Sequence, residues 1–223
     1  MLYPTAREAV VVPHRAAVRK AVGPLESRGD EQKDLADAQS RRIRTIRRYV
    51  VANSLSVLLT VTWADRARRT DTDAWADARS FIRRVRSAKI VAAQFPYVVG
   101  IDRGGKTGRI HGHLIMPTGD STQYQACWAH GTTSYDVLRS DEHRERAATY
   151  LALPHHPVQT AGGRFYEVGR GFQPEAIRIP TADANEALAE LTQRVGRAPD
   201  VVSTWTMSRM SVRWRNEDQE TAR

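Results

Sequence analysis

Two histidines separated by one residue lie inside the apolar run Arg109–Met116, and their type and spacing could do chemistry. The run is rich in Ile and Leu and ends at Pro117, a pattern that predicts a strand. Because side chains alternate between the two faces of a strand, we expect His111 and His113 to project from the same face. Two neutral imidazoles held side by side can bind a divalent metal ion.

A carboxylate precedes this strand. Asp102 follows the apolar run Phe95–Ile101, which predicts a second strand, and a polar hairpin turn leads from it to the histidines. Carboxylate oxygens suit Mg²⁺ or Mn²⁺, so Asp102 is our candidate third ligand. The alternative is that Asp102 only initiates the turn.

The turn itself matches a nucleotide-binding motif. Residues 100–107 fit the phosphate-loop pattern GxxxxGK[ST], but a true phosphate loop continues directly into a helix. Here the chain continues into the histidine strand, so we interpret the segment as a hairpin turn. Arg103 and Lys106 are then basic residues placed to line a nucleic-acid groove.

The elements that must position these residues alternate along the chain. Apolar runs predict strands at 55–63, 95–101, 109–116, 164–168 and 201–207, and helical spacing predicts helices at 139–153 and 183–195. A further helix, capped by Asp71 or Asp73, carries an apolar face from Trp75 to Val85. We therefore predict an α+β fold with a central antiparallel β-sheet and flanking helices. Residues 1–38 are expected to be a polar N-terminal arm, and 176–223 a helix-strand extension with a frayed tail.

The composition favours a polyanionic partner. The 223 residues carry a net charge of +9, and an arginine-rich helix is predicted over 39–51. That helix either contacts phosphates or is a solvated surface helix. The single cysteine, Cys127, excludes an internal disulfide. With no membrane-spanning apolar run, we expect a soluble cytoplasmic protein.

Several ordered motifs together resemble a known family. They are Leu-Leu-Thr-Val-Thr-Trp at 58–63, Pro-Tyr-Val-Val-Gly-Ile-Asp at 96–102 with the histidine strand, Trp-Ala-His-Gly at 128–131, Ala-Thr-Tyr-Leu-Ala at 148–152, and the segment 166–174. Over residues 39–175 the chain resembles the HUH endonucleases that initiate rolling-circle replication, closest to initiators of actinobacterial plasmids and phages.

The resemblance implies a function and roles. Tyr150 would attack a phosphodiester of single-stranded or unpaired origin DNA, forming a 5′-phosphotyrosine link, while His111, His113 and Asp102 would hold Mg²⁺ or Mn²⁺. A host helicase and DNA polymerase would be the partners, and the sequence leaves the oligomeric state open. The basic residues expected to contact DNA are Arg41, Arg42, Arg44, Arg47, Arg48, Arg103, Lys106 and Arg109.

The chain also departs from the family pattern. Leu153 and Pro154 stand where the family commonly has a lysine and a second tyrosine, and Gly112 replaces a bulky apolar residue, which predicts weaker packing behind the histidines. A relaxase or transposase of the same superfamily, or a catalytically degenerate DNA-binding protein, are the alternative functions. Tyr150 could instead be a core aromatic; Tyr135 and Tyr166 are then the alternative nucleophiles. His130 is an alternative metal ligand.

Overall fold

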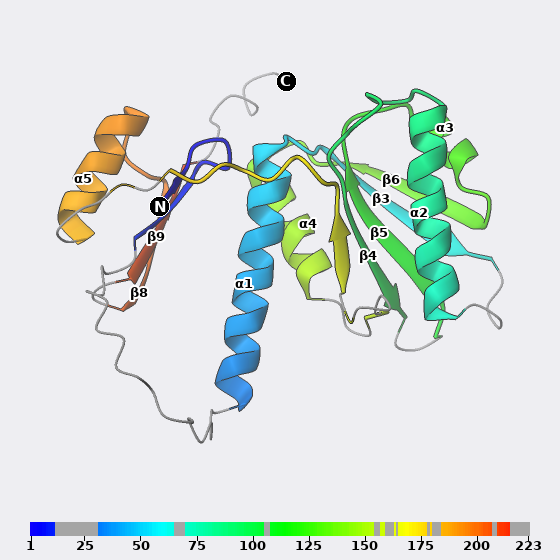
Figure 1. Cartoon of the computed structure of the whole chain (residues 1–223), viewed down its shortest axis with the longest axis horizontal. Coiled ribbons are helices and arrows are strands. Elements are labelled where there is room, and N and C mark those ends of the chain that lie inside the picture. The colour runs from blue at the N-terminus through cyan, green and yellow to red at the C-terminus, as the bar shows by residue number, and fades with distance from the viewer. Residues whose placement is uncertain are drawn as a thin grey trace.

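The structure is a computed structural model that describes residues 1–11, 31–64, 70–104, 108–153, 157–158, 163, 165–177, 179, 184–206 and 209–214. Over these residues the chain is α+β, with five helices and two antiparallel sheets (Figure 1). The α+β class is confirmed. The prediction of one central sheet is incomplete, because a second sheet stands beside it.

The larger sheet contains both candidate metal-binding strands. Its strand order is β6–β3–β5–β4–β7, and all neighbouring strands are antiparallel. The five strands are β3 (Val57–Trp63), β4 (Val98–Arg103), β5 (Ile110–Met116), β6 (Gly131–Val137) and β7 (Tyr166–Val168). Strands β6 and β7 are therefore the two edges. The histidine strand β5 lies in the middle, where it is held on both sides.

One face of this sheet packs against α2 (Asp71–Ser87) and α3 (Ser121–Cys127). The cap of α2 is Thr70 and not Asp71 or Asp73: its side chain accepts from the amide of Asp73, whose carboxylate accepts from Thr70 in return. The alternating residues of β3 are buried on this face, from Val57 to Trp63. Strand β6 and helix α3 are elements that the periodicity of the sequence did not predict.

Gly112 also lies on the α2 face, and the packing behind the histidines is filled. A Cβ added at Gly112 would come within 2.9 Å of a Val61 methyl and 3.7 Å of the Trp63 ring. The expectation of weakened packing is wrong, since these two side chains occupy the space that a bulky residue at 112 would take.

The other face is covered over only part of its length. Helices α1 (Glu31–Ala52) and α4 (Asp141–Ala152) bury a cluster that includes Ile46, Val98, Ile115 and Leu151. This cluster stands at one end of the strands. The other end of the same face carries polar residues, including His111 and Thr62, which are directly paired.

The smaller sheet joins the two ends of the described chain. Its order is β1 (Leu2–Tyr3), β2 (Glu8–Val11), β9 (Arg209–Arg213) and β8 (Val201–Thr206), and Leu191 of α5 (Ala184–Val195) packs against it. Residues 2–11 thus form the strands β1 and β2 and the turn between them, and α1 begins at Glu31, whereas the sequence predicts a polar arm over 1–38. A strand of four residues is too short to identify by periodicity, and its partner lies about two hundred residues away in the chain. The predicted frayed tail falls on residues 215–223, which lie outside the described residues.

Helix α1 lies between the two sheets (Figure 1). Buried Glu8 on β2 pairs with Arg47, and also with Arg48 at 2.7 Å. Arg213 on β9 pairs with Glu145 on α4 at 2.7 Å, and Arg7 pairs with Asp141 at the start of α4 at 2.6 Å. The smaller sheet is therefore joined to α1 and α4 by ion pairs that are largely shielded from water.

No helix among the described residues has the length and apolar character needed to cross a membrane.

Candidate functional site

The predicted histidine pair is formed on the open end of the α1/α4 face. His111 and His113 project from the same face of β5, with ring centroids 4.9 Å apart. Asp102 on β4 is directly opposite His111 in the register, so its side chain shares that face. The two histidines therefore lie on one face as expected and Asp102 lies beside them, while their metal-binding role stays a prediction.

Helix α4 brings Tyr150 to the same place. The Tyr150 hydroxyl lies 3.2 Å from Nε2 of His113, and the two rings meet edge to face at 4.8 Å between centroids. The side chain is 47% exposed, so the interpretation of Tyr150 as a core aromatic is wrong. The neighbouring Leu151 anchors this end of the helix: it approaches β4 so closely that a Cβ at Gly100 would lie 3.0 Å from its methyl group.

Both ring nitrogens of His113 have a partner. Nδ1 lies 3.2 Å from the hydroxyl of Thr60 on β3, opposite the Nε2 contact with Tyr150. The pKa of His113 is lowered to about 4, first by burial and then by the neighbouring His111, while the negative charge of Asp102 opposes the shift. His113 is consequently neutral at pH 7, which is the form that binds metal ions.

The same surroundings keep the proton on Tyr150. Its pKa is raised above the ordinary value of a tyrosine, first by burial and then by the negative charge of Asp102. Since the pKa of its partner His113 is lowered at the same time, proton transfer from the hydroxyl to the imidazole is unfavourable. A nucleophilic tyrosine at this position needs an additional positive charge to favour its ionised form.

The donor set fits a divalent cation in type. The Asp102 side chain is buried, with Oδ1 accepting from the amide of Arg103 at 2.8 Å, and Nδ1 of His111 lies 3.2 Å from the carbonyl oxygen of Arg109. Such contacts orient metal-binding side chains. A pocket of about 10 Å³, close to the room one water occupies, is lined by Asp102, His113 and Tyr150 among others. Across the described residues, however, no three His, Cys, Asp or Glu side chains converge closely enough to form a complete metal site.

The alternative metal ligand and the alternative nucleophiles lie on different faces of the larger sheet. His130 lies 3.2 Å from the Asp77 carboxylate of α2 and edge-on to Trp128, which places it on the α2 face, away from His113. The hydroxyl of Tyr135 donates to the carbonyl of Gly119 and its ring lies beside Tyr124, also on that face. Tyr166 alone shares the face of the histidines, because it pairs with Gly100 in the same row as His113.

The described basic residues that are predicted to contact DNA lie on α1 and at the turn between β4 and β5, and several of them make internal contacts. On α1, Arg47 is buried against Glu8, and burial lowers its pKa to about 10; Arg48 stacks on Tyr3 and pairs with Glu8. Arg42 donates to the carbonyl of Ala152 and lies over the Phe165 ring.

The remaining arginines differ in their surroundings. Arg41 is exposed, and Arg44 lines a cleft between α1 and the smaller sheet. Arg103 pairs with Asp71, and Arg109 donates to the carbonyl of Trp63. Lys106 lies outside the described residues. A phosphate-contacting role for these residues stays a prediction, but Arg42, Arg47 and Arg48 already make internal contacts.

Thr60 is a site residue that sequence reasoning missed. Its signal was present, because in the strand pattern of β3 the side chains of Thr60 and Thr62 alternate with buried apolar ones. A threonine on a strand face that is otherwise expected to be apolar indicates a polar partner on the neighbouring strand. For Thr60 that partner is His113 on β5.

The chain matches no known family model, and neither the curated proteins nor the solved structures compared with it include a match.

Proposed function

We propose that this chain is a rolling-circle replication initiator that nicks and rejoins single-stranded origin DNA, with Tyr150 as the nucleophile. The observation that carries the proposal is the hydroxyl of Tyr150, 3.2 Å from Nε2 of His113, on a sheet face shared with His111 and Asp102. A tyrosine with this neighbourhood is exposed to substrate and adjacent to metal-binding residue types. The ordered sequence motifs that resemble HUH endonucleases support the same function.

In the proposed reaction the Tyr150 oxygen attacks the phosphorus of the scissile phosphodiester. The tyrosine O–P bond forms, the bond from phosphorus to the 3′ oxygen breaks, the tyrosine loses its proton and the leaving 3′ oxygen gains one. Rejoining is the reverse reaction. Because the phosphodiester energy is kept in the phosphotyrosine, rejoining needs no ATP.

The side chains of the chain have separate roles in this scheme. Helix α4 positions the hydroxyl, and Thr60 orients the His113 imidazole through Nδ1. His111, His113 and Asp102 are the residues that would hold Mg²⁺ or Mn²⁺, and the cation would polarise the scissile phosphate and offset its developing charge. The Nδ1 contacts of the two rings, with Thr60 and with the carbonyl of Arg109, orient each Nε2 for this role.

The proposed function is tested by detecting a covalent adduct between the protein and DNA. Wild-type protein and Tyr150→Phe are incubated with single-stranded DNA of the protein's own replicon, with Mn²⁺ or with EDTA, and separated on a denaturing gel. We expect an adduct with wild type and Mn²⁺ only. Tyr135→Phe is the matched control, because it removes the hydroxyl of an alternative nucleophile on the opposite face of the sheet and should leave the adduct intact. An adduct that survives in Tyr150→Phe would refute the assignment of the nucleophile.

A second candidate function is a non-catalytic DNA-binding protein. Leu153 favours it, since this residue at the end of α4 packs against the α1/α4 cluster and stands where the family pattern has a lysine. Pro154 lies outside the described residues. DNA binding without any adduct, in Mn²⁺ and with wild-type protein, would support this function over the nuclease.

A further inference from the structure

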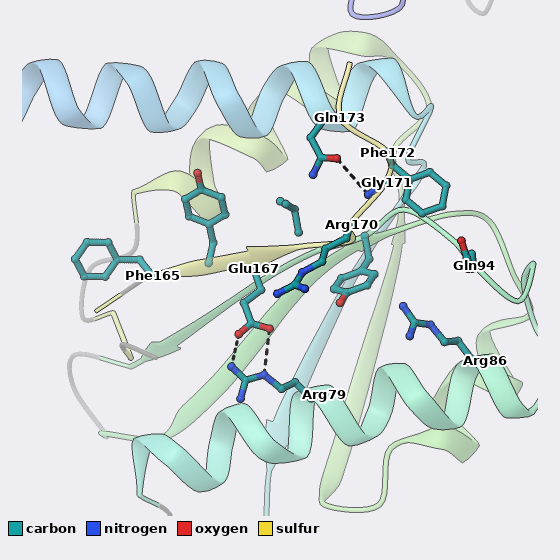
Figure 2. Close-up of a pocket in the computed structure, with 12 residues that line it drawn as sticks. Arg79, Arg86, Gln94, Phe165, Glu167, Arg170, Gly171, Phe172 and Gln173 are labelled. Carbon is teal, nitrogen blue, oxygen red and sulfur yellow. Dashed lines mark hydrogen bonds and ion pairs between the residues drawn. The ribbon is translucent and has the colours of Figure 1, made fainter. Parts of the chain in front are cut away.

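A groove of about 1,130 Å³ runs along the edge strand β7, and no predicted site residue except Tyr166 lines it. Figure 2 shows Arg79 and Arg86 extending from α2 toward β7 and the loop that carries Arg170. Three arginines and one glutamate line the groove, which gives it a net charge of +2. An anionic ligand is therefore favoured.

The net positive charge of the groove comes from two exposed arginines. Arg79 is paired with Glu167, while Arg86 and Arg170 are exposed and Arg86 lies over the Phe95 ring at 5.6 Å. All three arginines act on the Tyr97 hydroxyl: burial and the Glu167 carboxylate raise its pKa, and each of the three guanidinium charges opposes that rise.

Four aromatic rings line the groove together with these arginines. Tyr97, Phe165, Tyr166 and Phe172 all line the groove, and each is half-buried, held by the protein on one side and accessible on the other. Rings held in this way offer stacking surfaces to unpaired bases, while arginines beside them contact the phosphates between bases. A duplex hides the faces of its bases, so this combination favours a single strand.

The wall of the groove is held in place by hydrogen bonds. The Tyr49 hydroxyl donates to the carbonyl of Gly169 at 2.8 Å, and the amide of Asn53 donates to the carbonyl of Phe172 at 2.9 Å. The amide of Gly171 donates to the side chain of Gln173 at 3.2 Å (Figure 2). The loop after β7 therefore needs little rearrangement to bind a ligand, which lowers the entropy cost of binding.

Tyr166 is the link between the groove and the candidate active site, since Arg79, Tyr97 and Glu167 line the groove from the α2 face and the candidate site lies on the other face of the sheet. Tyr166, Gly100 and His113 stand in one row across β7, β4 and β5, on the same face. Two strand spacings separate Tyr166 from His113, which is about 10 Å between backbones. A strand of DNA that passes Tyr150 at one end of this row reaches Tyr166 at the other, where the groove begins at the edge of the sheet.

We propose that the β7 groove is a second binding site for single-stranded DNA, which holds the strand flanking the scissile phosphate by stacking on Tyr97, Tyr166 and Phe172 and by phosphate contacts with Arg86 and Arg170. The assignment of the ligand rests on the proposed function. The groove itself would act without sequence preference, because rings and guanidinium groups contact every nucleotide alike.

Binding is tested without cleavage, so that the two proposals can fail separately. Full-length protein carrying Tyr150→Phe, in EDTA, is titrated with a labelled oligothymidylate of about ten nucleotides, and fluorescence anisotropy is followed over a range of salt. Adding Arg86→Ala and Arg170→Ala should weaken binding about tenfold and reduce the salt slope by about 1.4, since each phosphate contact to a single strand contributes about 0.7. The matched control is Arg139→Ala with Arg194→Ala, which removes the same charge from exposed positions outside the groove.

Location is tested by photo-crosslinking of an iodouracil-substituted strand, followed by peptide mapping. We expect adducts in the peptide that contains Tyr166 and Phe172. Equal losses in the groove and control variants, crosslinks confined to other peptides, or tighter binding of a duplex or of polyglutamate would overturn the proposal. Loss of DNA binding in the groove variant with no adduct in the nicking assay would retain the groove and reject the nuclease. An adduct in the nicking assay, together with unchanged DNA binding by the groove variant, would retain the nuclease and reject the groove.

Discussion

The hydroxyl of Tyr150 and Nε2 of His113 are 3.2 Å apart, so the candidate nucleophile and a candidate metal ligand share one hydrogen bond. This relationship couples them in the protein without metal. Nε2 cannot coordinate a cation and contact the hydroxyl in the same way, and removing either partner changes what the other does.

Metal affinity should therefore increase when the hydroxyl is removed. Tyr150→Phe is expected to bind Mn²⁺ about fivefold more tightly than wild type, because a hydrogen bond of about 1 kcal/mol no longer competes for Nε2. Titration of free Mn²⁺ by electron paramagnetic resonance measures the change. His113→Gln is the control that should bind Mn²⁺ weakly with either residue at 150; an unaltered affinity in Tyr150→Phe would contradict this competition.

Stability should decrease in acid because of His113. Its pKa is about 4 in the folded protein against 6.5 for an unperturbed histidine, so the unfolded chain binds the proton more readily. The stabilisation is complete above pH 6.5, declines as the pH falls toward 4, and amounts to about 3 kcal/mol at most. Urea unfolding of wild type and His113→Gln at pH 7 and pH 4.5 measures it. The variant should lose less stability than wild type over this interval, and equal losses would show that His113 is not responsible.

The ion pairs between the smaller sheet and α1 should matter for folding. Glu8 is 1% exposed and lies between Arg47 and Arg48. Glu8→Ala leaves buried positive charge without a partner, and we expect a loss of about 3 kcal/mol in the free energy of unfolding. Glu142→Ala removes the same side chain from an exposed pair with Arg146 on α4, and should change stability by less than about 0.5 kcal/mol. Chemical denaturation compares the two, and similar losses would argue against a buried ionic contact.

The space beneath the histidine strand should not accept even a methyl group easily. Gly112→Ala would bring its Cβ within 2.9 Å of a Val61 methyl, and we expect a destabilisation of about 1–3 kcal/mol. Val61→Ala should restore part of this loss when the two changes are combined. Thermal or urea unfolding of the four proteins in the cycle gives the coupling energy. If the two effects simply add, the contact between residues 61 and 112 is not the cause.

Local patterns were sufficient for the elements that carry the candidate site. Alternation along β5 placed both histidines on one face, and the apolar face of α2 and the strands β3 and β4 were recognised with small errors at their ends. These features depend on neighbours within about ten residues, so the chain encodes them directly.

Other features depended on partners distant in the chain. The predicted N-terminal arm is part of a sheet because β2 pairs with β9. Arg47 and Arg48 form ion pairs with Glu8 inside the protein. The arginine-rich pattern of α1 is the same whether its arginines pair internally or bind phosphates. The same holds for His130, whose partner Asp77 is on α2.

The sequence by itself determined the candidate residues, because the spacing of His111 and His113 and the motifs around Asp102 and Tyr150 are local features of the chain. Only the tertiary structure decided that the hydroxyl of Tyr150 meets His113, since that contact depends on how closely α4 approaches β4 at Gly100. It also decided that the β7 groove exists, because its walls come from α2, β7 and the following loop. Contacts between distant segments are set by packing, which no local pattern specifies.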